Sequence, residues 1–171
     1  MVEPTLERQL PPVVMVVDDN SDTLEMYEEL LSSAGVWVTG TTRIDEALEC
    51  ALDLQPDMVL SGLTFNRTVT PGLEFIRQLK AQPKLRAVPV VLVLDSDTPD
   101  AGLEELQVDA LLKKPVEPAR LLEHMRLALE QSQRLRETST RLRASLAALM
   151  TRPQRAIDPS RTVGPLPPRT R

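Results

Sequence analysis

The sequence predicts an α/β fold in which parallel strands alternate with helices. Short apolar runs recur from residue 13 to residue 115, and the segments between them space their apolar residues as one face of a helix does. Several runs are apolar at every position, as in VVMVV (13–17) and VVLVL (90–94). Strands of this kind are buried on both faces, which is typical of parallel sheets covered by two layers of helices.

Five strands are predicted along this part of the chain. They cover residues 13–18, 36–40, 56–62, 88–94 and 108–115. Crossover connections between parallel strands are right-handed, which leaves few possible topologies. For five such units we expect the flavodoxin-like strand order 2-1-3-4-5, with helices on both faces of the sheet.

Helices are predicted from the apolar stripes between the strands. The first stripe covers 24–34, with Asp22 and Glu25 as a capping box and Gly35 as the left-handed residue that ends the helix. The next helix covers 44–54, with Thr42 as its N-cap. Two further helices are predicted at 73–79 and 101–107.

After Pro118 a long helix is predicted to about Met150, and its apolar residues follow a 4-3 repeat. The repeat consists of Leu121, Met125, Ala128, Leu135, Leu142, Leu146 and Leu149, with Ser132 and Ser139 in the remaining positions. The first turns can pack on the sheet, but a domain of this size leaves nothing for the later ones. We therefore predict a homodimer through a parallel two-stranded coiled coil, which the serines weaken while setting its register. The alternative is a solvated helix.

Composition argues against several classes of protein. Apolar residues make up 42% of the 171-residue chain and aromatic residues only 2%, which allows one good core but argues against a base-stacking nucleic-acid fold. No apolar run approaches the roughly 18 residues of a membrane span, and the N-terminus has no secretory pattern. The single cysteine, Cys50, cannot form an internal disulfide. We therefore expect a cytoplasmic protein.

Charge divides the chain into an acidic head and a basic tail. Residues 1–130 have a balance of −12 and residues 131–171 a balance of +7, which together give the net charge of −5. We expect a disordered arm at 1–11, a globular domain at 12–130, a helical extension at 131–150 and a disordered Pro/Arg-rich tail at 151–171. The tail supports an alternative function, which is electrostatic binding of nucleic acid or another anionic surface.

Candidate functional residues lie where the predicted strands end, because ligands of open parallel sheets bind beyond the carboxyl ends of the strands. Asp18 and Asp19 follow the first strand, Gly62 ends the third, and Lys114 ends the fifth. The acidic pair and the lysine should face each other across one crevice. We expect Lys114 to form an ion pair with Asp18 or Asp19, since unpaired buried carboxylates would be costly.

These segments resemble the receiver domain of bacterial response regulators, the CheY-like domain of two-component signalling. The matching motifs are VVMVVDDN (13–20), PDMVLSGL (56–63), GLEFIRQL (72–79), VPVVLVL (88–94) and LLKKP (111–115). They follow one another in the order found in the family, and the resemblance covers residues 12 to about 130. It implies a role in phosphorelay signalling with protein partners.

The resemblance also implies a set of phosphorylation residues, of which this chain lacks three. In the family, an acidic pair and a third aspartate hold Mg²⁺, the third aspartate becomes an acyl phosphate, and a Thr or Ser and a lysine bind the phosphoryl oxygens. Asp18, Asp19 and Lys114 match this set. The nucleophile position is Gly62, the Thr/Ser position is Leu94, and the position of the switching aromatic is Leu111.

We therefore predict a degenerate receiver that signals by protein contact, is not an enzyme and requires no cofactor. A residual Mg²⁺ site on Asp18 and Asp19 is a weaker alternative, because the third carboxylate is missing. A further alternative is a phosphorylatable receiver in which the register of the third strand is misread.

Overall fold

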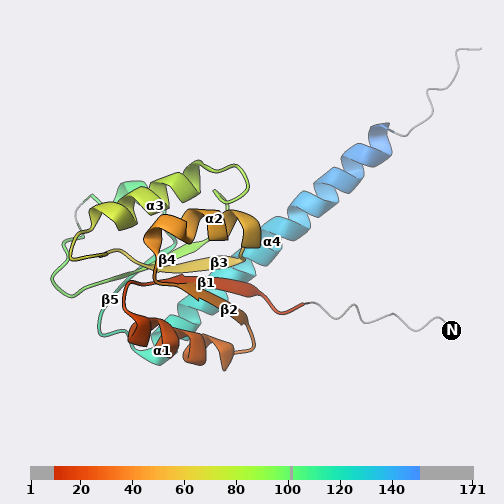
Figure 1. Cartoon of the computed structure of the whole chain (residues 1–171). Coiled ribbons are helices and arrows are strands. Elements are labelled where there is room, and N and C mark those ends of the chain that lie inside the picture. The colour runs from red at the N-terminus through yellow and green to blue at the C-terminus, as the bar shows by residue number, and fades with distance from the viewer. Residues whose placement is uncertain (1–9, 101, 151–171) are drawn as a thin grey trace, which may run out of the picture. The chain divides into compact units, whose positions relative to one another are not determined.

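The computed structural model describes residues 10–100 and 102–150, in which five parallel strands form one sheet with helices on both faces (Figure 1). The strands are β1 (Val13–Val17), β2 (Trp37–Thr41), β3 (Met58–Gly62), β4 (Val90–Leu94) and β5 (Ala110–Lys113). Their order is β2-β1-β3-β4-β5, which confirms the predicted topology. The carboxyl ends of β1, β3, β4 and β5 therefore lie along one edge of the sheet.

The helices of the described residues are α1 (Ser21–Ser32), α2 (Ile44–Leu54), α3 (Thr70–Ala81) and α4 (Pro118–Met150). Gly35 has the predicted left-handed conformation, with a φ of 83°, but it does not end α1, whose C-cap is Ser33 in a right-handed conformation. The predicted capping box is wrong. The side chain of Asn20 caps α1, because its amide oxygen accepts the backbone N–H groups of Asp22 (2.9 Å) and Thr23 (3.0 Å).

Two other helix predictions also need correction. Thr42 is not the N-cap of α2, since the helix begins after Arg43, whose N–H donates to Thr41 Oγ1 (3.1 Å). The helix predicted at 101–107 is a short 3₁₀ turn, η1 (Glu104–Leu106). It cannot extend as a regular helix because Gly102 and Gln107 on either side of it have positive φ angles of 85° and 53°.

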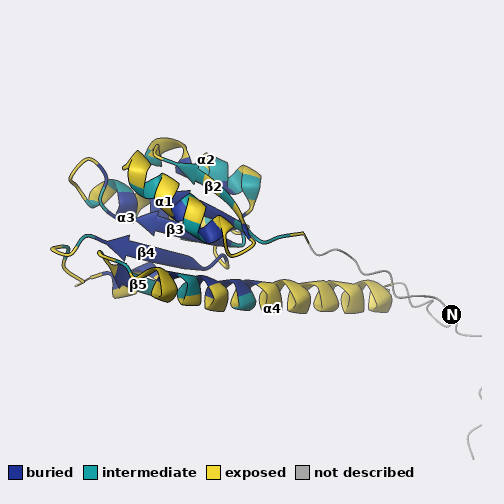
Figure 2. Cartoon of the chain, turned by 90° about the horizontal axis from the view of Figure 1, so that it is seen from below, coloured by how far each residue is buried: buried dark blue, intermediate teal, exposed yellow. Residues whose placement is uncertain are grey.

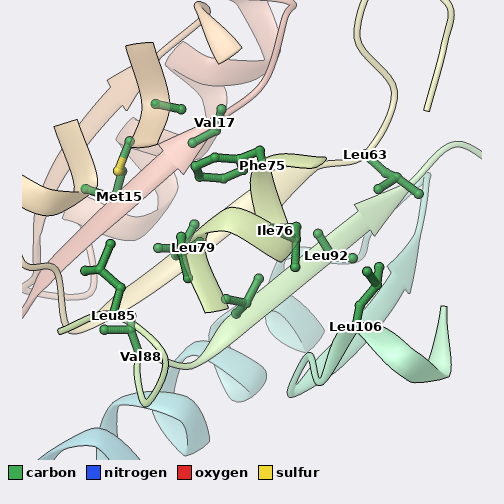
Figure 3. Close-up of a cluster of buried hydrophobic side chains, with 14 of the residues drawn as sticks. Met15, Val17, Leu63, Phe75, Ile76, Leu79, Leu85, Val88, Leu92 and Leu106 are labelled. Carbon is green, nitrogen blue, oxygen red and sulfur yellow. The ribbon is translucent and has the colours of Figure 1, made fainter. Parts of the chain in front are cut away.

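Two clusters of buried apolar side chains lie on the two faces of the sheet. Successive residues of β1 alternate between them, with Met15 and Val17 facing α2 and α3, and Val14 and Val16 facing α1 and α4. Figure 3 shows the first cluster, in which Phe75 of α3 lies over the sheet. Burial on both faces explains why β1 and β4 are apolar at every position.

The buried residues of α4 all lie in the first half of the helix. Leu121, Met125 and Ala128 are at most 5% exposed and belong to the cluster on the α1 face of the sheet. Their predicted part in helix pairing is therefore wrong, because the domain itself covers them. The remaining leucines of the repeat are 44–61% exposed, as the yellow part of α4 in Figure 2 illustrates, and they are Leu135, Leu142, Leu146 and Leu149.

The chain forms two compact units, residues 1–136 and 137–171. Arg136, at the end of the first unit, contacts the segment that leads into β3. Its Nη1 lies 2.8 Å from Asp57 Oδ1, and its Nη2 donates to the carbonyl oxygen of Gln55 (3.4 Å). These contacts keep the helix on the sheet domain as far as Arg136.

The predictions of a disordered N-terminal arm and a disordered C-terminal tail concern residues that lie almost entirely outside the described ranges. The tail predicted at 151–171 lies outside the described residues, as does all of the arm predicted at 1–11 except its last two residues. Among the helices of the described residues, none combines the length and the apolar character that crossing a bilayer would require.

Candidate functional site

Asp18 and Asp19 follow β1 at the carboxyl edge of the sheet and differ in their surroundings. Asp18 is 3% exposed, and its Oδ1 accepts the backbone N–H of Asn20 (2.9 Å). Burial raises the pKa of Asp18, against the opposing effects of the Asn20 hydrogen bond and the nearby charge of Lys114. The ionised form of this carboxylate therefore depends on partners within the fold.

Lys114 supplies the main positive charge at this edge. It follows β5, precedes a cis bond to Pro115, and places Nζ 3.6 Å from Asp18 Oδ2 and 3.3 Å from Asp95 Oδ1. Burial alone would lower the pKa of Lys114, but the two carboxylates outweigh that effect and raise it. The ion pair predicted between Lys114 and Asp18 is confirmed. The second partner, Asp95 at the end of β4, is an addition that the sequence did not predict.

Gly62 ends β3 beside Asp18. Ser61 pairs with Val17 of β1, and Gly62 follows it at the strand end. A Cβ atom placed on Gly62 would lie 3.2 Å from Asp18 Oδ2, so the Asp18 carboxylate takes up the space next to the missing side chain. The hydroxyl of Ser61 is buried and donates to the carbonyl oxygen of Gly62 (2.7 Å), so it is committed to the backbone.

The loop after β3 folds into a tight hairpin against Asp19. Phe65 and Thr68 exchange two backbone hydrogen bonds (2.8 and 3.0 Å), and the N–H of Asn66 donates to Asp19 Oδ2 (3.0 Å). Both turn residues, Asn66 and Arg67, have positive φ angles, of 51° and 65°. This geometry is that of a two-residue hairpin turn, for which asparagine is suited and arginine is not. The asparagine was the one available sequence signal for this turn, and sequence reasoning missed it.

The residues present do not fit a Mg²⁺ site. Magnesium requires near-octahedral oxygen ligands, usually with one or two carboxylates. Asp18 is already paired with Lys114, Asp19 holds the Asn66 hairpin, and Gly62 offers no side chain. Within the described ranges, no three His, Cys, Asp or Glu side chains are grouped so that they could hold a metal ion. The geometry thus argues against the residual metal site on Asp18 and Asp19.

The two other positions singled out in the sequence are apolar side chains of the core. Leu94 ends β4 and is fully buried, and the partly buried Leu111 of β5 packs against the same cluster. The two strands are adjacent, with Leu92 opposite Leu111 and Leu94 opposite Lys113. Neither leucine can form a hydrogen bond to an anion in the crevice.

The fold and this edge of the sheet agree with a known family. The family model described as "Response regulator receiver domain" matches residues 14–126, which is more than half of the chain. The chain belongs to the response-regulator receiver family. This family membership places the receiver domain in two-component signalling.

Individual relatives support the assignment of the receiver domain. The "Polar-differentiation response regulator DivK" of Brucella anthropi is 27% identical over 118 residues, covering 67% of this chain and 93% of that protein. Chemotaxis protein CheY4 of Vibrio cholerae has a TM-score of 0.62 at 24% identity, covering 70% of this chain and 99% of that one. A response regulator receiver domain protein of Clostridium thermocellum has a TM-score of 0.65 at 20% identity, with coverages of 72% and 98%. The two structural likenesses show the fold.

Proposed function

We propose that this receiver acts in two-component signalling by protein–protein contact and is not phosphorylated at the usual position. The observation that supports this most directly is Gly62, which stands at the end of β3 beside Asp18, the ion-pair partner of Lys114. An acyl phosphate needs a carboxylate nucleophile, and glycine has none. The proposal makes the chain a non-enzymatic, cytoplasmic signalling module, with Leu94 and Leu111 in place of the residues that sense a phosphoryl group.

The other aspartate of this strand region is unsuited to replace the missing nucleophile. Asp57 precedes β3 and so lies at the opposite, amino end of the strand. Its carboxylate accepts the N–H of Val13 (2.8 Å) and pairs with Arg136 (2.8 Å). A five-residue strand separates it from the crevice by about 16 Å. Asp57 therefore has a structural role.

The absence of phosphorylation can be tested with acetyl phosphate and Mg²⁺, followed by intact mass spectrometry under non-denaturing conditions. We expect no adduct of about 80 Da, the mass of one phosphoryl group, on the native chain. The Gly62→Asp variant is the matched positive test, since it places a carboxylate beside Asp18 and Lys114. A stable adduct on the native chain would support the misread-register alternative and overturn the proposal.

We further propose that the exposed leucines of α4 pair two copies of the chain in a parallel coiled coil. Leu135, Leu142 and Leu149 form one column, and Leu146 belongs to the other. The positions beside the first column include Arg136 and Arg143. An antiparallel pair would bring these arginines of the two helices together, whereas a parallel pair sets Arg136 opposite Gln131 and Arg143 opposite Thr138. Charge therefore favours the parallel arrangement.

Pairing should be weak, and this sets the design of its test. The association of two chains costs about 4–15 kcal/mol in lost freedom of motion. The exposed part of the repeat also has the polar Ser139 at one of its core positions, which adds little to pairing. In sedimentation experiments over a range of concentrations, Leu142→Ser should raise the dissociation constant at least about tenfold. The control is Leu127→Ser, because Leu127 is also exposed (48%) but lies off the repeat. Equal effects of the two variants would contradict the proposal.

The basic segment supports a second candidate function, nonspecific binding of nucleic acid. Residues 131–171 have a charge balance of +7 against −12 for the rest of the chain. Binding of this type depends on counterion release and should collapse between about 50 and 200 mM salt. Pairing through leucines should persist across the same range, so a salt titration of both properties distinguishes them.

A further inference from the structure

The outer edge of β2 carries unpaired backbone groups. β2 is terminal in the sheet, and no described strand lies on its outer side. The N–H of Trp37 donates to the carbonyl oxygen of Pro12 (2.8 Å), and the carbonyl of Thr41 accepts the N–H of Asp18 (3.3 Å). The odd-numbered residues of β2 thus face β1. Because alternate residues of a strand turn these groups to opposite sides, Val38 and Gly40 present their N–H and C=O groups outward.

This edge lacks the features that usually protect a sheet edge from further pairing. The strand reads WVTGT, with no charged residue and no proline, and Trp37 is 60% exposed. Natural edge strands are commonly blunted by charge, proline or a bulge. The opposite edge strand, β5, has such a charge, since Lys113 pairs with Asp100 (2.9 Å). β2 is therefore suited to accept an additional strand.

The helices α1 and α2, which follow β1 and β2, are strongly acidic. α1 contains four carboxylates and α2 contains four, and neither helix includes Lys or Arg. Glu28 of α1 lies directly over the edge strand, because its Oε1 occupies the space that a Cβ on Gly40 would need. Arg43 neutralises part of the α2 charge by pairing with Asp45 (3.1 Å) and Glu46 (3.0 Å). The edge remains bordered by net negative charge.

We propose that the β2 edge binds an extended basic segment of a partner protein by strand addition. The partner's backbone would pair with Val38 and Gly40, and alternate Lys or Arg side chains would face Glu28 or the ring of Trp37. Pairing with the β2 edge of a second copy is disfavoured, because the acidic helices of the two copies would approach each other. The proposed surface shares no residue with the crevice or with the exposed leucines of α4.

Binding can be measured on the full chain through Trp37, its single tryptophan. The probe is a peptide that alternates lysine with threonine. We expect a saturable blue shift of the tryptophan emission as the ring is covered. Val38→Pro removes an outward N–H and should weaken binding about tenfold, while circular dichroism checks that the variant folds.

Charge-matched controls separate strand addition from simple electrostatic attraction. Glu28→Lys should weaken binding, whereas Glu105→Lys, with the same charge change next to the opposite edge of the sheet, should not. A peptide with the same lysines but proline at the alternate positions should not bind, because proline cannot pair along the strand. Equal binding of the proline peptide, equal effects of the two charge reversals, or no saturable shift would each overturn the proposal. So would a shift that depends on protein concentration without peptide, which would indicate a second copy as the occupant.

Discussion

At the scale of single residues, the crevice is held together by one cation and two carboxylates. Lys114 bridges the buried Asp18 and the half-exposed Asp95. The pKa of Asp18 is raised above 3.8 by burial, so its ionised form costs stability at neutral pH, and that cost disappears as the pH falls toward 3.8. The pKa of Lys114 is raised above 10.5, so its contribution is complete below pH 10.5 and is lost in more alkaline solution.

Replacing Lys114 should therefore destabilise the domain in a pH-dependent way. Lys114→Met leaves the Asp18 charge buried without its partner, and should lower the free energy of unfolding at pH 7 by about 1–2 kcal/mol. The deficit should shrink as the pH is lowered toward 4 and Asp18 takes up a proton. Urea denaturation at several pH values measures both effects. The double variant Asp18→Asn with Lys114→Met should recover most of the loss at pH 7, and a deficit that is independent of pH would contradict this account.

The hairpin turn at Asn66 and Arg67 strains the backbone at Arg67. Arg67 has a φ of 65°, a conformation that costs a residue with a side chain about 1–2 kcal/mol. Arg67→Gly should therefore raise the free energy of unfolding by about 0.5–1 kcal/mol, after allowance for the greater freedom of glycine in the unfolded chain. Thermal or urea denaturation can measure the change. Asn66→Gly is the control, with a smaller expected gain because asparagine tolerates this conformation.

At the scale of elements, a close approach between the β3–α3 loop and α3 explains a glycine inside the helix. Gly72 lies in the first turns of α3, and a Cβ there would collide with the backbone carbonyl of Leu63. The helix predicted from the apolar stripe covers only 73–79, because the Thr/Pro/Gly-rich segment before Leu73 is typical of a loop. The structure begins it at Thr70, because tight packing on Leu63 outweighs local preference.

Gly72→Ala and Gly62→Ala form a matched pair of variants for this interpretation. Gly72→Ala should cost about 2–4 kcal/mol of unfolding free energy, because backbone must move to admit the methyl group. Gly62→Ala should cost less than about 1 kcal/mol, since its new Cβ meets only the end of the Asp18 side chain at 3.2 Å. Comparable losses in urea denaturation would refute the difference in packing.

At the scale of the whole molecule, the exposed repeat extends beyond the unit that contains the sheet: Leu135 lies in the first unit, and Leu142, Leu146 and Leu149 lie in the second. The first unit ends at Arg136, beyond the predicted domain end at 130. Two features account for the longer unit: Ser132 is 5% exposed, and Arg136 pairs with the mostly buried carboxylate of Asp57. A hydrophobic pattern could not place this boundary, because both features are polar.

Two truncations test where the folded domain ends. A chain ending at Arg136 should unfold with a free energy within about 0.5 kcal/mol of the full chain but should no longer self-associate. In a chain ending at residue 130, the free energy of unfolding should be lower by about 1–3 kcal/mol. This truncation removes Arg136, the ion-pair partner of Asp57, and the buried residue Ser132. Urea denaturation and sedimentation measure the two properties. Equal stability of the two truncated chains would show that α4 needs no support from Arg136.

The strand order, the placement of the main helices and the family could all be predicted from the amino-acid sequence. These depend on periodic apolar residues and on short motifs, which act within a window of a few residues. The sequence also brought Asp18, Lys114 and Gly62 to one edge, because the carboxyl ends of parallel strands share that edge. The ion pair between Lys114 and Asp18 follows from the same argument.

The groups that complete these contacts became evident from the packed fold. Asp95 as a second partner of Lys114, the Asn66 hairpin on Asp19, and the extent of the buried part of α4, as far as Ser132, were not predicted. Each of them depends on which segments, distant in the sequence, meet after packing. The apolar repeat of α4 is buried in the first half of the helix and exposed in the second half. The spacing of the apolar residues is the same in both halves, so it does not distinguish them. Burial depends on which other segments pack against each half.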